Sequence, residues 1–212
     1  MRGISKNRGL TYGLGINDAD YVTCKTEKYM DANGKQRQRQ IWHCPFHLVW
    51  TKLIYRFSPE WLNKYPTYEN VDLFSDWIYF SKFKSWMETQ DWEGKQLDKD
   101  LLSGENKIYS PDTCIFIPQE LNKFLIDFQR KGQNSELPKG AYPTTSGRFM
   151  SKVSNPFSGR LDYLGYFDTA EEAHIAWRGR KLEFALLWAE KINDERVTKS
   201  LVNKYQNYEE SK

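Results

Sequence analysis

Apolar residues recur at helical spacing in four stretches of the chain. The clearest is residues 73–90, where aromatic side chains return every three or four positions and lysines lie between them. Residues 47–56, 118–128 and 194–212 show the same period. An amphipathic helix has this pattern because one of its faces packs on a core. We therefore predict a helix in each stretch, with the aromatic stripe of residues 73–90 in the core.

Two stretches near the N-terminus have the extended character of strands. They are residues 21–29 and 37–44, and Asn33-Gly34 lies between them. Asn-Gly is the preferred dipeptide for a tight hairpin turn because both of its residues tolerate a positive φ. The sequence therefore predicts a β-hairpin close to the N-terminus.

The second strand of this hairpin, RQRQIWH, carries long polar side chains at alternate positions. Alternation places one set on one face of the ribbon. We expect Arg37 and Arg39 to lie on DNA phosphates and Ile41 to pack inward. The alternative is an ordinary solvent-exposed face.

The second half of the chain has a different pattern of apolar and polar residues. Residues 140–142, 147–154 and 161–167 are short extended runs separated by turn residues, which predicts a three-stranded antiparallel meander. Thr169 and Glu172 then form a capping box at the start of a long helix. Small apolar residues on that helix allow it to lie close to the sheet.

These elements predict an α+β fold. The polar run at residues 130–135 can neither pack nor stay regular, so we place a domain boundary there. The first domain, residues 1–130, would hold the hairpin and helices around a centre at residues 97–116. The second, residues 131–212, would hold the three-stranded sheet, its long helix and a last helix.

Composition is that of a folded protein outside the membrane. The chain has 212 residues, of which 39% are hydrophobic and 16% aromatic, enough for a packed core. No apolar run approaches the roughly 20 residues of a membrane span, and no signal peptide is evident. Cys24, Cys44 and Cys114 are an odd number without close spacing, which is typical of a reducing compartment. We expect a cytoplasmic protein.

Cys24, His43, Cys44 and His47 are the residues in this chain that could bind zinc. Their spacing fits no common zinc template. Buried thiols and packing histidines are the more frequent use of such residues, so we do not expect a zinc site.

Charge is informative by its distribution. The net charge of +3 is too small to indicate a function. The first 56 residues, however, carry ten Lys or Arg against four acids, and residues 138–160 carry four Lys or Arg and no acid. Two basic regions favour a polyanionic partner held at two places, and solvated faces are the alternative.

The outward face of the predicted sheet combines cations with aromatic rings. We expect it to carry Tyr142, Arg148, Lys152, Arg160 and Tyr163. Such a face can enter the major groove of double-stranded DNA, where Arg reads guanine. A protein-binding sheet is the alternative, and the absence of acids from this stretch favours DNA.

Four segments of the second half resemble a known DNA-binding domain. Residues 140–142 (GAY), 146–149 (SGRF), 164–169 (LGYFDT) and 170–177 (AEEAHIAW) are similar to the ethylene-response-factor, or apetala-type, domain. The resemblance covers about residues 137–190. It implies a three-stranded sheet that lies in the major groove and is backed by one helix.

The chain departs from the plant domain at two sites, because Tyr142 and Ser154 stand where that domain has arginines. The resemblance therefore does not imply which bases are read. Domains of this kind also occur at the C-terminus of phage-encoded HNH homing-endonuclease-like proteins, and this draws attention to residues 97–116.

Many acidic, basic and other polar residues lie close together in residues 97–116, LDKDLLSGENKIYSPDTCIF. Ser110 and Pro111 are suited to the N-cap and first position of a helix, so the order predicted is strand, loop, helix. In a ββα arrangement an acid on the strand and a polar residue on the helix can meet at one cation. Oxygen ligands suit magnesium, manganese or calcium.

By resemblance to the HNH pattern, Asp98 is a metal ligand, with Asp100 as a second carboxylate. Asn106 lies near the middle Asn of that pattern, and SPDTC at residues 110–114 matches its Ser-Pro-Glu-Asn-Leu. Lys99 stands where the family has its general-base His, and Thr113 stands where it has a helix Asn. An ordinary Lys is protonated at neutral pH and acts as a cation, whereas imidazole titrates near the working pH.

The sequence thus leaves three functional hypotheses. The favoured one is a phage-type protein that binds double-stranded DNA and has a degenerate HNH centre, in which Lys99 touches phosphate. The second is an active endonuclease that uses magnesium or manganese at Asp98. The third is a phage protein that binds a host protein in the host cytoplasm.

Overall fold

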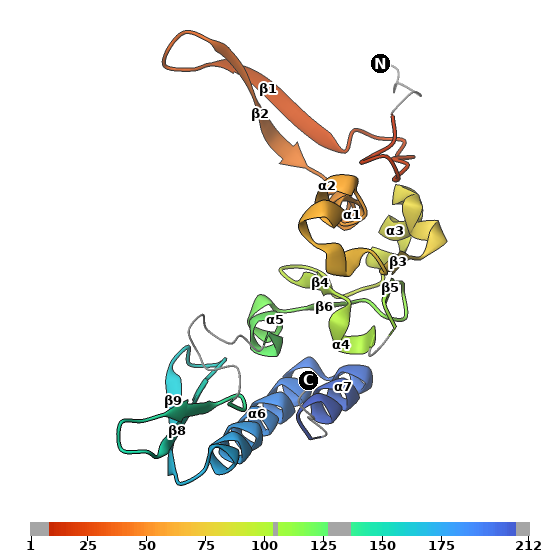
Figure 1. The fold of residues 1–212 in the computed structure, drawn as a ribbon. Helices are drawn as coiled ribbons and strands as arrows, with labels where there is room; N and C mark the ends of the chain where they lie inside the picture. The colour runs from red at the N-terminus through yellow and green to blue at the C-terminus, as the bar shows by residue number, and fades with distance from the viewer. Residues whose placement is uncertain (1–8, 104–105, 127–136, 207–212) are drawn as a thin grey trace. The chain divides into compact units, whose positions relative to one another are not determined.

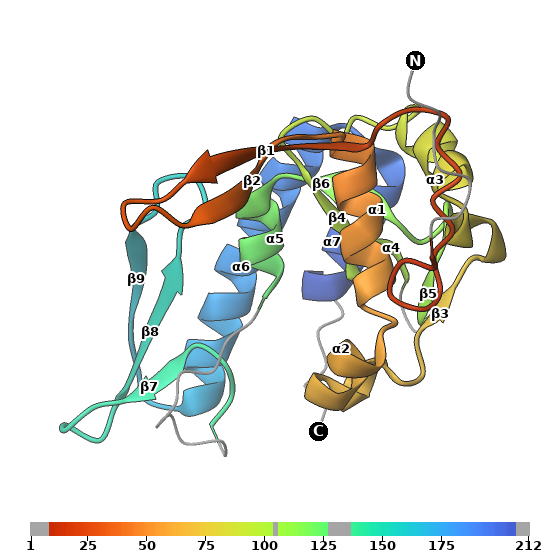
Figure 2. The ribbon, with the colours of Figure 1, turned by 90° about the horizontal axis from the view of Figure 1, so that it is seen from above.

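A computed structural model describes residues 9–103, 106–126 and 137–206 of the chain (Figures 1 and 2). It forms two compact units, Met1–Glu93 with Ser103–Phe116, and Gly94–Leu102 with Ile117–Lys212. The boundary expected after residue 130 lies outside the described residues. The division into domains at residues 130 and 131 therefore stays a prediction.

The predicted hairpin is present in the first unit. Strands β1 (Cys24–Met30) and β2 (Gln36–His43) pair antiparallel, with Lys28 opposite Gln38. Gly34 in the turn has φ 70°, a conformation that favours glycine. The ribbon extends as two long strands (Figure 1), and almost all its residues are exposed. Ile41 is 54% exposed, so the expectation that it packs inward is wrong: a two-stranded ribbon has no second layer to bury it.

Helix α1 (Pro45–Tyr55) confirms the helix predicted at residues 47–56. It packs on α3 (Phe80–Met87), and Trp50 donates a hydrogen bond from its indole N–H to the carbonyl of Trp77 at 2.8 Å. The smaller helices of this unit are α2 (Pro59–Lys64), η1 (Pro66–Tyr68) and η2 (Ser75–Ile78). The core of the unit contains Trp50, Leu53, Ile54, Trp77, Phe80, Phe83 and Met87.

The single helix predicted over residues 73–90 is wrong, because the chain there is broken into β3 (Asp72–Leu73), η2 and α3. Ile16 is the cause. Its N–H donates to the carbonyl of Ile78 at 2.8 Å, and its carbonyl accepts the N–H of Phe80 at 3.0 Å. These bonds draw backbone groups away from helical partners, so α3 starts only at Phe80. Strand β3 pairs in parallel with β5 (Ile108–Tyr109).

The second unit contains the predicted meander. Strands β7 (Ala141–Pro143), β8 (Phe149–Ser154) and β9 (Leu161–Phe167) form an antiparallel sheet in the order β7-β8-β9. Helix α6 (Ala170–Ile192) packs on all three strands, as Figure 2 shows. The mixed fold, with an N-terminal hairpin and a three-stranded sheet on one long helix, is confirmed.

Local chemistry explains both ends of α6. Thr169 accepts the N–H of Glu172 while the Glu172 carboxylate accepts the N–H of Thr169, so the predicted capping box is present. Asn193, with φ 54°, ends the helix. Helix α7 (Glu195–Gln206) follows and packs on α6 through Val197, Leu201 and Tyr205. It confirms the last predicted helix as far as the described residues extend.

The unit is completed by three short elements, β4 (Gln96–Asp98), α4 (Asp100–Ser103) and α5 (Gln119–Leu125). A hydrogen bond of 2.9 Å from Asn122 Nδ2 to Gln96 Oε1 joins α5 to β4. Within the described ranges of the chain, α6 is long enough to cross a membrane, but neither it nor another helix is also apolar enough.

Candidate nucleic-acid interface

The outer side of the β7–β9 sheet carries a row of aromatic and basic side chains. Tyr142 lies opposite Met150, Met150 lies opposite Tyr166, and Lys152 lies opposite Tyr163. Directly paired residues share one face of a sheet. The intervening Ala141, Ser151 and Val153 are buried on the helix side. We call Tyr142, Met150, Lys152, Tyr163 and Tyr166 the outer sheet face.

Exposure and charge suit this face to a polar partner. Tyr163 and Tyr166 are 69% and 60% exposed. Lys152 Nζ lies 4.8 Å from the centroid of the Tyr142 ring, a distance typical of a cation–π contact. The structure thus brings together Tyr142, Lys152 and Tyr163, three of the residues selected from the sequence.

Met150 and Tyr166 were missed by the sequence argument. Strict alternation from Tyr163 would turn Tyr166 inward, but the register shifts by one residue between Ser151 and Lys152. Gly165, with φ 125°, lies at this bulge in β9. A glycine inside a strand pattern was therefore the available signal.

Arg148 and Arg160 lie at the ends of the strands. Arg148 donates from Nε to Asp168 Oδ1 and from Nη2 to the carbonyl of Tyr166, each at 2.9 Å. Arg160 is exposed in the β8–β9 turn, which the side chain of Asn155 organises by accepting the N–H groups of Phe157 and Ser158. Arg148 is thus held in place, and Asp168 offsets part of its charge.

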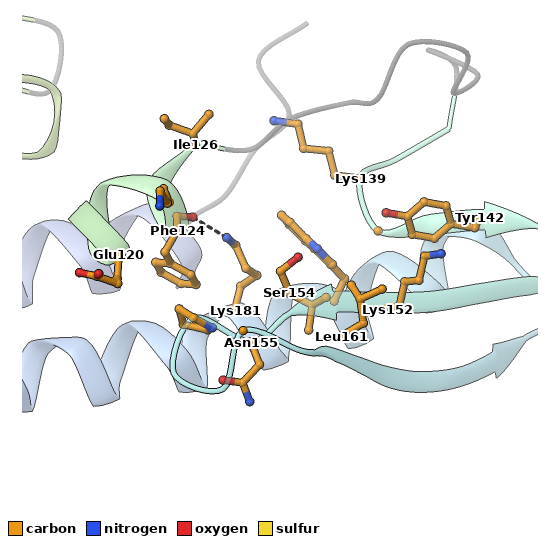
Figure 3. A pocket seen from close by; sticks show the side chains of 16 residues that line it. Glu120, Phe124, Ile126, Lys139, Tyr142, Lys152, Ser154, Asn155, Leu161 and Lys181 are labelled. Carbon is orange, nitrogen blue, oxygen red and sulfur yellow. Dashed lines mark hydrogen bonds between the residues drawn. The ribbon is translucent and has the colours of Figure 1, made fainter. Parts of the chain in front are cut away.

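A groove of about 540 Å³ adjoins the outer sheet face (Figure 3). Its wall includes Lys123, Lys139 and Lys152, with Glu120 as the acid of the lining. Lys181 is buried beside it and donates to the carbonyl of Phe124 at 2.8 Å, as the dashed line in Figure 3 marks. The groove is therefore cationic, and it shares Tyr142 and Lys152 with the outer sheet face.

The two hairpin arginines also share one face. Glu27 lies opposite Arg39 and Tyr29 lies opposite Arg37. Arg39 donates from Nε to Glu27 Oε1 at 2.5 Å, and its guanidinium lies 5.3 Å from the centroid of the Tyr29 ring. Arg37 donates from Nε to Asp31 Oδ2 at 2.8 Å. We call Glu27, Tyr29, Arg37 and Arg39 the hairpin face.

Asp98 has a structural function in the centre. Its Oδ1 accepts the N–H of Leu101 at 2.8 Å, so it caps the short helix α4. Burial raises the pKa of Asp98, and the neighbouring Asp100 adds to this effect. Lys99 is only 7% exposed and forms an ion pair of 2.5 Å with Asp100. Asp98 is therefore bound to the local backbone, and Lys99 and Asp100 are bound to each other.

The helix predicted from Ser110 is wrong. Thr113 Oγ1 accepts the N–H of Ser110 at 3.0 Å and donates to the carbonyl of Ile108 at 2.6 Å, which closes a turn. Strand β6 (Ile115–Ile117) follows. The buried run of β-branched and aromatic residues after Thr113 favours a strand over a helix.

The residues of the predicted centre fall in both units. Asp98, Lys99 and Asp100 belong to the second, whereas Asn106 and Thr113 belong to the first. Asn106 is exposed, and its N–H donates to the carbonyl of Ser103. Among the residues that the structure describes, no three His, Cys, Asp or Glu side chains are grouped to hold a metal ion. A magnesium or manganese site at Asp98 and Asp100 stays a prediction.

The cysteines and histidines near the hairpin make hydrogen bonds. His43 Nε2 lies 2.8 Å from His47 Nδ1, and Cys24 Sγ lies 3.4 Å from Gln40 Oε1. Cys44 Sγ lies 3.4 Å from the hydroxyl of Tyr21. Burial lowers the pKa of His43, and the charge of Lys52 acts in the same direction. These four side chains therefore take part in hydrogen bonds within the fold.

Comparison with protein-family models, with curated proteins and with solved structures gives no match for this chain.

Proposed function

We propose that this is a phage-type protein that binds double-stranded DNA and has a degenerate HNH centre. The observation that carries the proposal is the outer sheet face. Its outward strand positions hold three tyrosines and Lys152 without a carboxylate along β7, β8 and β9. Arg148 and Arg160 lie at its ends. Cations attract phosphates, and tyrosines add hydroxyl and ring contacts.

The dimensions of the sheet agree with this use. Adjacent strands lie about 4.8 Å apart, so three strands span roughly 10 Å. The major groove of B-form DNA is about 12 Å wide and admits secondary-structure elements of this size. The side chains on the outer sheet face would then meet base edges and the flanking phosphates.

The degenerate character of the centre is supported by how its residues are engaged. Asp98 caps α4, and the Lys99 ammonium is paired with Asp100. In this proposal Asp98 stabilises the fold, and the buried Lys99 forms an ion pair with Asp100 where a nuclease would have its general base. A general base would instead have to give and take a proton near the working pH.

Electrophoretic shift of a random-sequence duplex tests DNA binding. We expect salt-sensitive binding that weakens in Lys152→Gln, while Lys199→Gln, which removes the same charge from α7, binds nearly as the wild type does. Binding that is absent at low ionic strength contradicts the proposal. A protein partner captured equally by the wild type and by Arg148→Ala with Lys152→Ala would instead favour the host-protein hypothesis.

Plasmid incubated with magnesium or manganese tests the centre. We expect neither the wild type nor Asp98→Ala to cut it. Cutting by the wild type that is lost in Asp98→Ala would show an active metal-dependent endonuclease. It would contradict the proposal that the HNH-like centre is degenerate.

A further inference from the structure

Both arginines of the hairpin face are held by a carboxylate at the same atom. Arg37 uses Nε to reach Asp31 at 2.8 Å, and Arg39 uses Nε to reach Glu27 at 2.5 Å. A guanidinium has five N–H donors, of which Nε supplies one. Each arginine therefore keeps its two Nη groups for another acceptor. The arginine side chains are half exposed or more, at 52% and 63%, so that acceptor can come from outside.

Asp31 is itself fixed by the hairpin turn. Its Oδ1 accepts the backbone N–H groups of Asn33 and Lys35, each at 3.0 Å, while its Oδ2 accepts from Arg37. The Arg37 guanidinium and these amides hold the pKa of Asp31 below its usual range. The carboxylate is thus ionised at neutral pH and oriented by the backbone. It can hold Arg37 in a defined direction.

Arg39 is held from two sides. Glu27 binds Nε, and the guanidinium carbon lies 5.3 Å from the centroid of the Tyr29 ring. A cation–π contact and pairing at Nε both restrict the rotation of a long side chain. Part of the rotamer entropy that a ligand would otherwise remove is already lost in the free protein.

Stability of the hairpin does not by itself account for this arrangement. Ion pairs between exposed side chains contribute little because solvent screens them. The opposite face is different in kind, since it carries Lys28 opposite Gln38, and Gln38 Nε2 donates to Thr26 Oγ1. The carboxylate-held cations are therefore confined to one side of the ribbon.

The shape of the ribbon selects the acceptor. A two-stranded β-ribbon fits the major groove, and a guanidinium binds guanine by donating to O6 and N7 together. Arg37 and Arg39 are two residues apart on one strand, which places them about 6.8 Å apart along it. Base pairs are stacked about 3.4 Å apart, so the two side chains can meet guanines one or two steps apart.

We propose that the hairpin face reads guanine in the major groove of double-stranded DNA, with Arg37 and Arg39 as the contacting residues and Asp31 and Glu27 as positioning residues. The inference rests on the proposed function, because it requires that the protein bind DNA. It adds a second interface in the other unit and assigns sequence selectivity to it.

Selection of duplexes with a randomised central segment, using the full chain, tests the arginines. We expect the wild type to enrich a motif with guanines. Arg37→Gln and Arg39→Gln should each lose one guanine from it. Lys28→Gln removes the same charge from the opposite face, so it should weaken binding to all duplexes alike and keep the motif. A motif unchanged by both arginine substitutions overturns the inference.

Substitution of Asp31 or Glu27 should change overall affinity and sequence selectivity in opposite directions. Asp31→Asn retains an oxygen for the turn amides, and Glu27→Gln has nearly the shape of the original, but each removes a negative charge. Electrostatics alone must then strengthen binding to a random duplex. Positioning requires that the ratio of affinities for the selected and the random duplex fall, by about tenfold for one lost bidentate contact. An unchanged ratio contradicts the positioning function.

The two proposals fail differently. If the wild type retains no duplex from the library, the proposed function fails and this inference fails with it. If it retains duplexes whose motif ignores Arg37, Arg39 and their acids, DNA binding stands and only the inference fails.

Discussion

The outer sheet face and the hairpin face use the same kinds of residue in different settings. Lys152 lies over a tyrosine ring on a sheet that is packed on α6. Arg37 and Arg39 lie on a ribbon exposed on both faces, and each is held by a carboxylate. A point charge on a rigid support suits phosphate of any sequence, whereas a fixed guanidinium fork suits one base. Under the proposed function, the outer sheet face would supply affinity for DNA and the hairpin face would supply selectivity for its sequence.

The largest expected effect breaks the support of the outer sheet face. In Gly140→Ala the new Cβ would lie 2.2 Å from Cγ of Trp177, at a residue with φ 82°. Overpacking and strain together should lower the free energy of unfolding by about 3 kcal/mol. Urea denaturation of the full chain measures it.

Gly147→Ala is the matched control, since Gly147 also has a positive φ, of 79°, but nothing lies within 4 Å of its added Cβ. It should cost only about 1 kcal/mol, from backbone strain. Equal losses in the two variants would mean that the contact with Trp177 does not support the sheet.

The second expected effect separates the contributions of charged and aromatic residues of the outer sheet face to DNA affinity. Replacing both Tyr163 and Tyr166 with Ala should weaken binding to a random duplex about tenfold through lost hydroxyl contacts to phosphates and apolar contacts to base edges. The slope of log affinity against log salt should not change, because no charge is removed. Lys152→Gln should reduce that slope by about 0.9, the value for one phosphate contact. Titrations at several salt concentrations measure both quantities.

Leu187→Ala, an exposed apolar residue of α6, controls for general effects of removing surface side chains. If the tyrosine variant changes the salt slope as Lys152→Gln does, the proposed separation of ring and charge contacts is incorrect.

The third expected effect concerns Asp98, which belongs to neither face. Its folded pKa is raised above the unfolded value, so its protonation stabilises the fold at low pH, and this contribution is lost as the pH rises through the folded pKa. Asp98→Asn cannot ionise but keeps an oxygen for Leu101. We expect its stability relative to the wild type to increase from about pH 4 to pH 7.

Asp98→Ala removes the cap at every pH and should cost about 1 kcal/mol relative to Asp98→Asn. Urea denaturation across this pH range measures both differences. A stability difference between Asp98→Asn and the wild type that stays constant or falls with pH would contradict the burial of a carboxylate there.

Local chemistry made much of this fold predictable. Asn33-Gly34 and the Thr169–Glu172 capping box each act within a few residues, and both elements are present. The break in residues 73–90 was not predictable from periodicity, because it depends on hydrogen bonds from Ile16, about sixty residues away. A long-range backbone contact leaves no mark on the local pattern.

The candidate sites also combine residues that the sequence predicts with contacts that it does not. The search for cations and aromatic rings on the sheet selected Tyr142, Lys152 and Tyr163, but the bulge at Gly165 decides that Tyr166 joins them. Arg37 and Arg39 could be selected by charge. Their pairing with Asp31 and Glu27 depends on the register of β1 and β2, which the composition of the strands does not specify.

The smallest expected effect compares the exposed hairpin ribbon with the sheet that is packed on α6. Ile41 is exposed on a ribbon without a second layer, so Ile41→Ala should change the free energy of unfolding by less than about 0.5 kcal/mol. Val153→Ala, which removes a buried side chain between β8 and α6, should cost about 2 kcal/mol. Urea denaturation of both variants measures the ratio. A cost for Ile41→Ala near that for Val153→Ala would mean that the ribbon is packed in solution, and the arginines would then owe their fixed positions to that packing as well as to Asp31 and Glu27.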